Sequence, residues 1–328
     1  MKIELRVTAV LAALALASLP DGRAAASCGA ENCPLDTQAH SLREGRFGLD
    51  LSFQYIDQDR LRIGTHRAAV GELPSPEDEV RTTSRMVTAT ARGQLAPSLG
   101  ITLALPYVDR EHQHIRNEEG APSEPMDFRY SGLGDLTMMG QWMALGTDPS
   151  RGSVALMAGV KLPTGRKNVT AIDGEQPEPP ARPGTGSIDG LVGIHLMRPI
   201  RLPSATAATA PLFATIQGRF NGRGTDDYRV GDELQVSVGG TYPVGERFDL
   251  LSQLNLRVRG KDDVGQTDAL RDNSGGTWLY LSPGVRVHTS SLLAVYAYAQ
   301  VPVYERVNRI QLVSPVHLMI GTSYAFGR

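Results

Sequence analysis

Residues 46–55, RFGLDLSFQY, decide the fold class, because apolar and polar side chains alternate along them without interruption. In a β-strand, successive side chains point to opposite faces of the sheet. The stretch therefore has an apolar and a polar face: Phe47, Leu49, Leu51, Phe53 and Tyr55 against Arg46, Gly48, Asp50, Ser52 and Gln54. An alternating segment of roughly ten residues is typical of a strand that crosses a membrane in a β-barrel.

Similar alternation recurs along most of the chain. In residues 309–326, at the C-terminal end, one parity carries Ile310, Leu312, Val316, Leu318, Ile320, Tyr324 and Phe326. Ten further segments predict strands: residues 79–94, 100–111, 132–144, 153–162, 186–197, 211–220, 232–242, 247–259, 277–288 and 292–303. We therefore predict an all-β fold, a transmembrane antiparallel β-barrel of about twelve strands within residues 45–328.

Long and short connections alternate between these predicted strands. Residues 57–78 form a long polar stretch after the first strand, whereas only residues 96–99 join the second to the third. Outer-membrane barrels have tight periplasmic turns and long outer loops, so this alternation favours such a barrel. The exception is 198–210, which is longer than a tight turn. With an even number of strands, both termini are expected in the periplasm.

A secreted β-sandwich is the main alternative architecture, because its strands alternate too. Its strands are usually shorter, nearer six residues, than the segments found here. The chain also ends on an alternating strand with Tyr324 and Phe326 near its end. This end resembles the signal that the outer-membrane assembly machinery recognises, so we expect that machinery and the lipid bilayer of the outer membrane as partners.

The N-terminus has the features of a secretory signal peptide. Lys2 and Arg6 precede the apolar residues 7–19, and an Ala-Ala-Ala sequence follows at 24–26. We predict cleavage after about Ala26, which exports the mature protein to the cell outer membrane. The predicted signal peptide is residues 1–26, followed by a periplasmic N-terminal segment of residues 27–44.

Two cysteines, Cys28 and Cys33, lie in that N-terminal segment. In the oxidising periplasm we expect them to form a local disulfide. Acylation of Cys28 is the alternative, but Ala25 stands where a lipoprotein usually has leucine. A metal site would need further ligands, and residues 27–36 offer only Glu31 and Asp36.

Composition excludes two other classes of protein. Beyond the N-terminus there is no run of eighteen apolar residues, which a helical membrane protein would need. The formal net charge of -2 gives no basic excess and argues against nucleic acid as a partner.

Three glycine-rich motifs follow one another in the middle of the chain. They are GLGDL at residues 132–136, GVKLPTG at 159–165 and GTGS at 184–187, with Asp189 just after the last. In this order and spacing they resemble a family of outer-membrane proteins named for the MetA-pathway of phenol degradation. The resemblance implies a barrel and transport of small molecules such as aromatic compounds.

The glycines of these motifs also have a structural explanation. Glycine in a strand permits bending and close approach at barrel corners. We favour this role over solute binding for the six glycines on or beside these strands: Gly132, Gly134, Gly159, Gly184, Gly186 and Gly190.

If the apolar parity faces lipid, the other parity lines the lumen, where charged side chains avoid the hydrocarbon. The candidate lumen-lining residues are Arg46, Asp50, Asp135, Lys161, Asp189, His195, Arg219, Arg257, Arg259, Arg286 and His317. Asp135, Lys161 and Asp189 belong to neighbouring predicted strands, and we expect a carboxylate–ammonium–carboxylate cluster. It would narrow a pore, bind a polar solute or simply fill the interior. We expect the wall around this cluster to be acidic and the opposite wall to be basic, because the opposite wall would carry Arg257, Arg259 and Arg286.

Catalytic and cofactor motifs are absent from the sequence. No nucleophile elbow, phosphate-binding loop or zinc-finger spacing occurs, so we expect neither an enzyme nor a cofactor or metal. His112 and His114 flank Gln113 on a predicted charged loop, and two alternating histidines could share a metal. A solvated loop is the more common origin of such a run. His195 and His317 have no spacing that marks them as catalytic.

Three functions remain open at this level. The favoured one is an outer-membrane channel or uptake pore for small, hydrophobic or aromatic solutes. The alternatives are a structural or adhesive barrel with a plugged lumen and an outer-membrane barrel enzyme. Twelve strands lie between small filled barrels and open sixteen-stranded porins, so the strand count does not decide.

Overall fold

The computed structural model describes residues 46–73, 77–116, 125–146, 152–170, 177–201, 209–264 and 271–327. The predicted signal peptide, the segment 27–44 and both cysteines, Cys28 and Cys33, lie outside the described residues. Cleavage after residue 26 and the disulfide therefore stay predictions.

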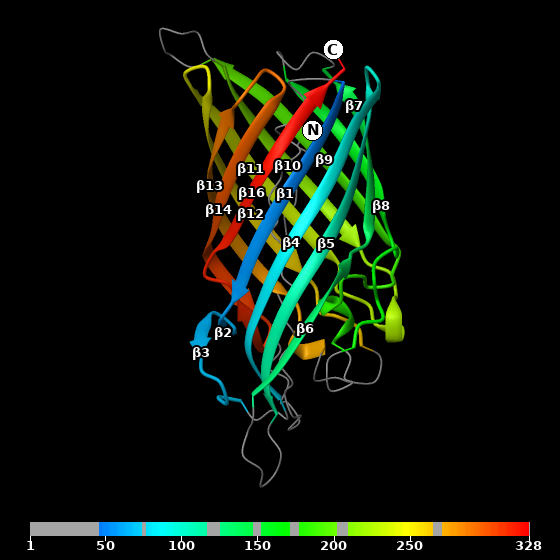
Figure 1. Ribbon diagram of the computed structural model, residues 1–328, viewed down its shortest axis with the longest axis vertical. Coiled ribbons are helices and arrows are strands. Elements are labelled where there is room, and N and C mark those ends of the chain that lie inside the picture. Colours follow the sequence, from blue (N-terminus) through cyan, green and yellow to red (C-terminus); the bar gives the residue numbers. More distant parts are fainter. Residues whose placement is uncertain are drawn as a thin grey trace, which may run out of the picture.

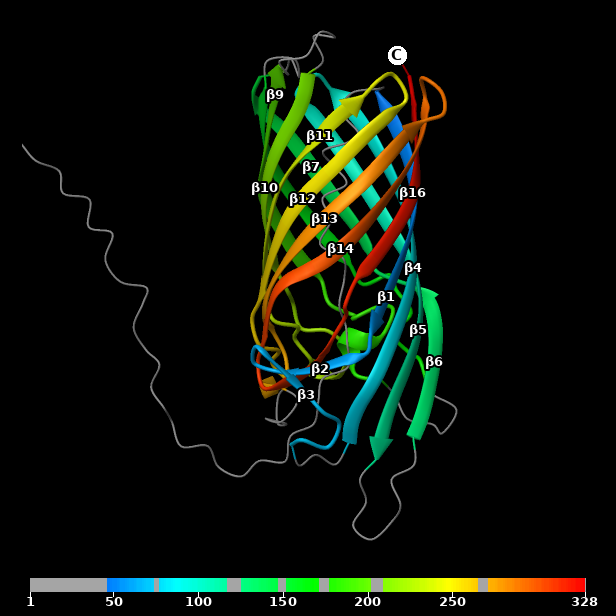
Figure 2. The same ribbon diagram turned by 90° about the vertical axis from the view of Figure 1, so that its left-hand side faces the viewer.

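The described chain forms a closed antiparallel barrel of twelve strands (Figures 1 and 2). In order around the wall they are β1 (Phe47–Gln58), β4 (Glu77–Ala96), β5 (Leu99–Arg116), β7 (Leu136–Leu145), β8 (Ser153–Leu162), β9 (Asp189–Arg201), β10 (Thr209–Phe220), β11 (Glu233–Val244), β12 (Phe248–Arg259), β13 (Gly276–His288), β14 (Leu293–Val307) and β16 (His317–Phe326). The first strand pairs with the last, with Phe47 opposite Phe326, and this pairing closes the wall. The predicted fold class is confirmed.

The alternation in the first strand separates a lipid-facing from a lumen-facing side. Leu49 and Leu51 are 52% and 51% exposed on the outside, whereas Asp50 and Ser52 are 8% and 6% exposed on the inside. A shift of one residue would exchange the two faces, so burial of one parity specifies the register. Exposed apolar side chains of this parity surround the barrel as a continuous belt, as a transmembrane barrel requires.

The C-terminal segment 309–326 is not one strand, contrary to the sequence prediction. It divides into β15 (Ile310–Val313) and β16, with Pro315 between them. Proline has no N–H for the ladder, and the alternation hides this interruption. The prediction that Ile310 and Leu312 share the lipid face is wrong, because both are buried against Leu61.

A small sheet outside the barrel wall explains this burial. It has the order β15, β2 (Arg60–Ile63), β3 (His66–Ala68). The predicted loop 57–78 therefore contains two short strands. Their apolar residues pack in a separate cluster near one end of the barrel.

At the end of the barrel away from the C-terminus, β4 and β5 extend beyond the other strands, with β6 (Pro125–Leu133) alongside β5 (Figure 2). The charged loop predicted around His112 and His114, which the sequence places at residues 112–131, is consequently strand over much of its length. His112 and His114 lie in β5 and are buried rather than solvated. His112 contacts Thr82 Oγ1 at 2.8 Å and Glu79 Oε2 at 3.0 Å. Among the described residues no group of three His, Cys, Asp or Glu side chains is placed to hold a metal ion.

Two predicted boundaries differ in a way that affects the site. The predicted strand 132–144 is interrupted at Gly134-Asp135, between β6 and β7. The long link 198–210 shortens, because β9 continues to Arg201 and β10 begins at Thr209. Within the described part of the chain, no helix has both the length and the hydropathy to cross a bilayer.

Candidate functional site

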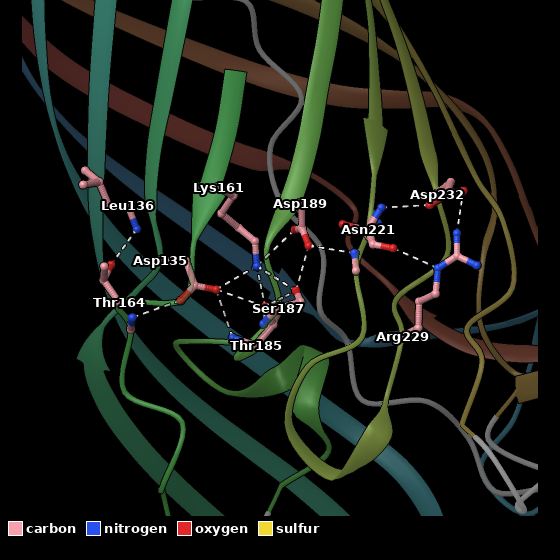
Figure 3. A network of polar contacts seen from close by, with 12 residues as sticks. Asp135, Leu136, Lys161, Thr164, Thr185, Ser187, Asp189, Asn221, Arg229 and Asp232 are labelled. Carbon is pink, nitrogen blue, oxygen red and sulfur yellow. Dashed lines mark hydrogen bonds and ion pairs between the residues drawn. The ribbon is translucent and has the colours of Figure 1, made fainter. Parts of the chain in front are cut away.

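The interruption at Gly134-Asp135 brings the three glycine motifs together around one buried lysine (Figure 3). Lys161 Nζ, at the end of β8, lies 2.8 Å from Asp135 Oδ2 and 3.0 Å from Asp189 Oδ2, the latter in β9. All three residues are at most 6% exposed. The structure thus brings together Asp135, Lys161 and Asp189, as the strand order predicted.

Asp135 also fastens two loop segments to the wall. Its Oδ1 accepts a hydrogen bond from the Gly165 N–H at 2.9 Å, and its Oδ2 accepts from the Thr185 N–H at 3.1 Å. Thr185 further contacts Lys161 through its hydroxyl. Ser187 Oγ donates to Asp189 Oδ1 at 2.7 Å. Buried charges are tolerated only when paired and hydrogen-bonded, and this cluster meets that condition.

The motif glycines allow three backbone segments to touch beside this cluster. A Cβ on Gly165 would lie 2.7 Å from the carbonyl carbon of Gly134 and 2.7 Å from Gly184 Cα. A Cβ on Gly184 would lie 2.6 Å from the carbonyl carbon of Gly165. Close approach therefore explains Gly165, which was not among the glycines singled out from the sequence, and Gly184, which was. It does not explain Gly190, where an added Cβ would meet nothing within 4 Å.

The segment that follows Gly165 returns across the barrel. Ala181, in the short helix η2 (Pro179–Ala181), is completely buried and packs with Tyr130 and Val169. Arg110 of β5 donates to Ala181 O at 2.5 Å and to Ser84 Oγ at 2.9 Å. These contacts hold the segment against the inner face of β4 and β5.

A chamber of about 250 Å³ lies in the lumen beside this segment. One side is mostly apolar and comes from β4 and β5: Met86, Thr88, Ala104, Pro106 and Val108. The other side is charged and comes from β8 to β12: Lys161, Asp189, Arg219, Glu233, Arg257 and Arg259. In the closed strand order, β4 and β5 stand opposite β11 and β12, so the two sides face each other.

The predicted separation into an acidic and a basic wall is not what the chamber has. Arg257 Nε donates to Glu233 Oε2 at 2.8 Å, and Arg259 donates to Asp262 at 2.9 Å. The carboxylates thus lie on the same side as the arginines. Glu233 comes from the neighbouring strand β11, and Asp262 follows Arg259 by three residues. Arg286 lies outside the chamber lining, 3.7 Å from Asp249.

Asp262 connects the charged side to the segment between β10 and β11. It accepts hydrogen bonds from the Tyr228 hydroxyl at 2.5 Å and from the Gly231 N–H at 2.8 Å, as well as from Arg259. Tyr228 is buried, and burial together with the negative charge of Asp262 raises the pKa of its hydroxyl above the ordinary value. The tyrosine therefore keeps its proton and donates a hydrogen bond to this carboxylate throughout the neutral range.

The remaining predicted residues lie apart from the chamber. Arg46 is exposed, precedes β1 and donates to Gln94 O at 3.2 Å, so the prediction that it lines the lumen is wrong. It has lumen parity, and its backbone bonds Gly327 and Gln94, but it lies at the end of the barrel, where its side chain is exposed. Asp50 is buried in the lumen and accepts the Tyr296 hydroxyl at 3.0 Å.

The two candidate histidines are also lumenal and buried. His195 Nδ1 lies 2.8 Å from Thr215 Oγ1, and its ring stacks on Phe213 with centroids 6.1 Å apart. His317 Nδ1 lies 2.9 Å from Gln300 Oε1. These contacts are those of a packed polar interior.

Three charged chamber residues were not among the predicted lumen residues: Arg110, Arg182 and Glu233. Glu233 lies at the start of the predicted strand 232–242. Arg110 shares the parity of Val108 within a predicted strand, so counting parity would have found it. Arg182 lies in a long connection with five prolines in its surroundings, and no local pattern indicates that it returns into the barrel.

The chain is similar to known outer-membrane proteins in sequence family and in fold. The model of the family described as "MetA-pathway of phenol degradation" matches residues 80–309. No curated protein shows significant sequence similarity to the chain. An outer membrane channel from Pseudomonas putida F1 has 13% identity and a TM-score of 0.60, covering 89% of this chain and 99% of that one.

Other barrels are less similar. The transport unit of the autotransporter AIDA-I from Escherichia coli has 10% identity and a TM-score of 0.46, covering 89% of this chain and 93% of its own. The NanC porin has 9% identity and a TM-score of 0.46, covering 85% and 100%. At such identities the likeness concerns the fold alone. Because the family model spans more than half of the sequence, the chain belongs to the MetA-pathway of phenol degradation family of outer-membrane β-barrels.

Proposed function

We propose that the protein is an outer-membrane channel for small solutes, with hydrophobic or aromatic molecules among them, and not an enzyme. The main support for this proposal is the chamber of about 250 Å³ inside the wall. Side chains that only fill a barrel for stability pack closely and leave few voids of this size. Its volume suits a single small molecule rather than a polymer. The mixture of apolar and charged lining would let it accept an amphipathic solute.

The segment around η2 would act as the constriction of this channel. Ala181 is completely buried, and Arg110 of β5 donates a hydrogen bond to its carbonyl oxygen. Constrictions formed by inward loops restrict the size of solutes while the wall keeps its shape. The solute would therefore meet the Lys161 cluster and the arginines of β10 to β12 at the narrowest place.

We further propose that the end carrying Phe47 and Phe326 faces the periplasm. Connections at this end are tight, as in 245–247 between β11 and β12 and 289–292 between β13 and β14. Periplasmic turns of outer-membrane barrels are short. The extended β4, β5 and β6 would then project outside the cell, and the apolar belt would contact the lipid bilayer.

Conductance of the purified, folded protein in a planar bilayer tests the proposal, with liposome swelling in graded sugars and aromatic alcohols as a second measurement. We expect discrete current steps and swelling only with the smaller solutes. Folding is checked independently by the heat-dependent shift in gel mobility that intact barrels show. Folded protein with neither current nor swelling would reject the channel.

The same experiment addresses the structural or adhesive alternative. The specific observation in its favour is the buried η2 segment, which narrows the lumen. A variant with Arg110→Ala loses the hydrogen bond to Ala181 O, and a channel predicts larger current steps for this variant. A plugged barrel predicts no current for either the wild type or the Arg110→Ala variant.

A further inference from the structure

The positive charges that face the chamber are not all neutralised. Four of them are paired with carboxylates: Lys161 with Asp135 and Asp189, Arg257 with Glu233, Arg259 with Asp262 and Arg182 with Asp226. Within the described residues, Arg110 has no carboxylate partner, and Arg219 shares the charge of Glu233 with Arg257. Six cations are thus matched by five carboxylates, because Lys161 has two, and the chamber keeps an excess of one positive charge.

Arg219 is more exposed than Arg110. It lies on the lumen face of β10, directly across the ladder from Glu233. Arg257 already occupies that carboxylate at 2.8 Å. Among the described residues, Arg219 interacts with Glu233 only through the longer-range field, without a direct side-chain hydrogen bond, and it lines the chamber. An arginine held in this state presents its donors to whatever enters the chamber.

Arg110 and Arg182 add donors from the opposite side and from the inward segment. Arg110 is buried, and within the part of the chain that the structure describes it donates only to neutral oxygens, those of Ser84 and Ala181. Arg182 is 6% exposed, and its Nη1 is buried with no hydrogen-bond partner in the described chain. Buried donors without acceptors are rare in folded proteins, which suggests a polar group that comes from outside the chain.

The rest of the lining limits what that group can be attached to. Met86, Pro106 and Val108 face the arginines across the barrel, and Pro180 and Pro183 cover the chamber. A bare inorganic anion would leave these apolar surfaces against water. A carboxylate carried on a small apolar body matches both sides, because guanidinium groups bind carboxylates with two parallel hydrogen bonds.

We propose that the chamber is a binding site for a small organic monocarboxylate with an apolar or aromatic body, whose carboxylate is bound by Arg219. This inference rests on the proposed function, since it names the class of solute that the channel takes up. The apolar body lies against Met86 and Val108, and the long-range field of Arg110 adds to the attraction for the anion.

Benzoate is a suitable probe, with benzyl alcohol as a neutral molecule of similar size. Binding is measured by calorimetry on folded protein in detergent, and by the concentration of benzoate that halves the single-channel current. We expect Arg219→Gln to weaken benzoate binding about tenfold, as loss of a charge-assisted hydrogen bond does. Arg219→Lys should retain part of the affinity, and benzyl alcohol should not distinguish the variants.

Arg286→Gln is the matched control, because it removes a lumenal arginine that lies outside the chamber lining. It should bind benzoate like the wild type. Equal benzoate affinity in wild type and Arg219→Gln overturns the inference, as does equal weakening in Arg286→Gln. Calorimetric binding that depends on Arg219 without any channel current would support the site and reject only the proposed channel, so the two failures are distinguishable.

Discussion

Lys161 and Arg219 line the same chamber, but their surroundings differ. Lys161 lies between two carboxylates at 2.8 and 3.0 Å and is buried among the motif glycines. Arg219 stands opposite Glu233, whose close partner is Arg257. The first cation holds three segments of chain together, and the second has no such task among the described residues. The difference teaches that a position in the lumen does not by itself indicate solute binding. A lumenal cation is a candidate for solute binding when it has no close carboxylate of its own.

Lys161→Met should have the largest effect on stability. It leaves Asp135 and Asp189 buried without their cation, which costs about 3–5 kcal/mol in the free energy of unfolding. Urea unfolding in detergent, followed by tryptophan fluorescence, measures this. Lys261→Met is the control, because Lys261 is exposed and pairs with exposed Asp272, so its loss should cost less than about 0.5 kcal/mol. Equal stability of the two variants would show that the cluster does not hold the wall.

Gly165→Ala should destabilise the same region by about 1–3 kcal/mol, because its methyl group has no space between Gly134 and Gly184. Gly190→Ala, in a neighbouring strand, meets nothing within 4 Å and should be nearly neutral. The comparison uses the same unfolding measurement. If both substitutions were neutral, the backbone segments would not be as close as described.

Tyr228→Phe removes one of the donors to Asp262 and should cost about 1.5 kcal/mol, the value of a hydrogen bond to a charged group. Because the pKa of Tyr228 is raised in the folded state, its contribution is complete below the unfolded-state pKa near 10. Above that pH the unfolded chain ionises first and the contribution is lost. Unfolding at pH 8 and pH 11 should therefore give a smaller difference between the two proteins at pH 11, and a constant difference would contradict the raised pKa.

Arg219→Gln should have the smallest effect on stability, within about 0.5 kcal/mol, since Glu233 keeps Arg257 as its close partner. Its loss of benzoate affinity would then separate binding from folding, the reverse of what is expected for Lys161→Met. A large destabilisation by Arg219→Gln, measured by the same urea unfolding, would remove the distinction between the two cations.

Part of the site could be predicted because it depends on strand order alone. Asp135, Lys161 and Asp189 stand at the ends of consecutive strands, so antiparallel pairing must bring them near one another. The same is true of the lipid-facing parity of residues 46–55. Arg46 shows the limit of this reasoning, because parity assigned it to the lumen although it lies at the end of the wall with an exposed side chain.

The sequence by itself determined the class of fold, the approximate strands and the faces, because alternation is a local property that a pleated strand converts directly into inside and outside. Only the tertiary structure decided that Ile310 and Leu312 leave the wall for a second sheet, and that residues near 179–183 return into the lumen beside Arg110. It also decided that Arg257 rather than Arg219 donates the close hydrogen bond to Glu233. These outcomes depend on contacts between segments far apart in the chain, and no local period encodes which of two competing side chains reaches a shared partner.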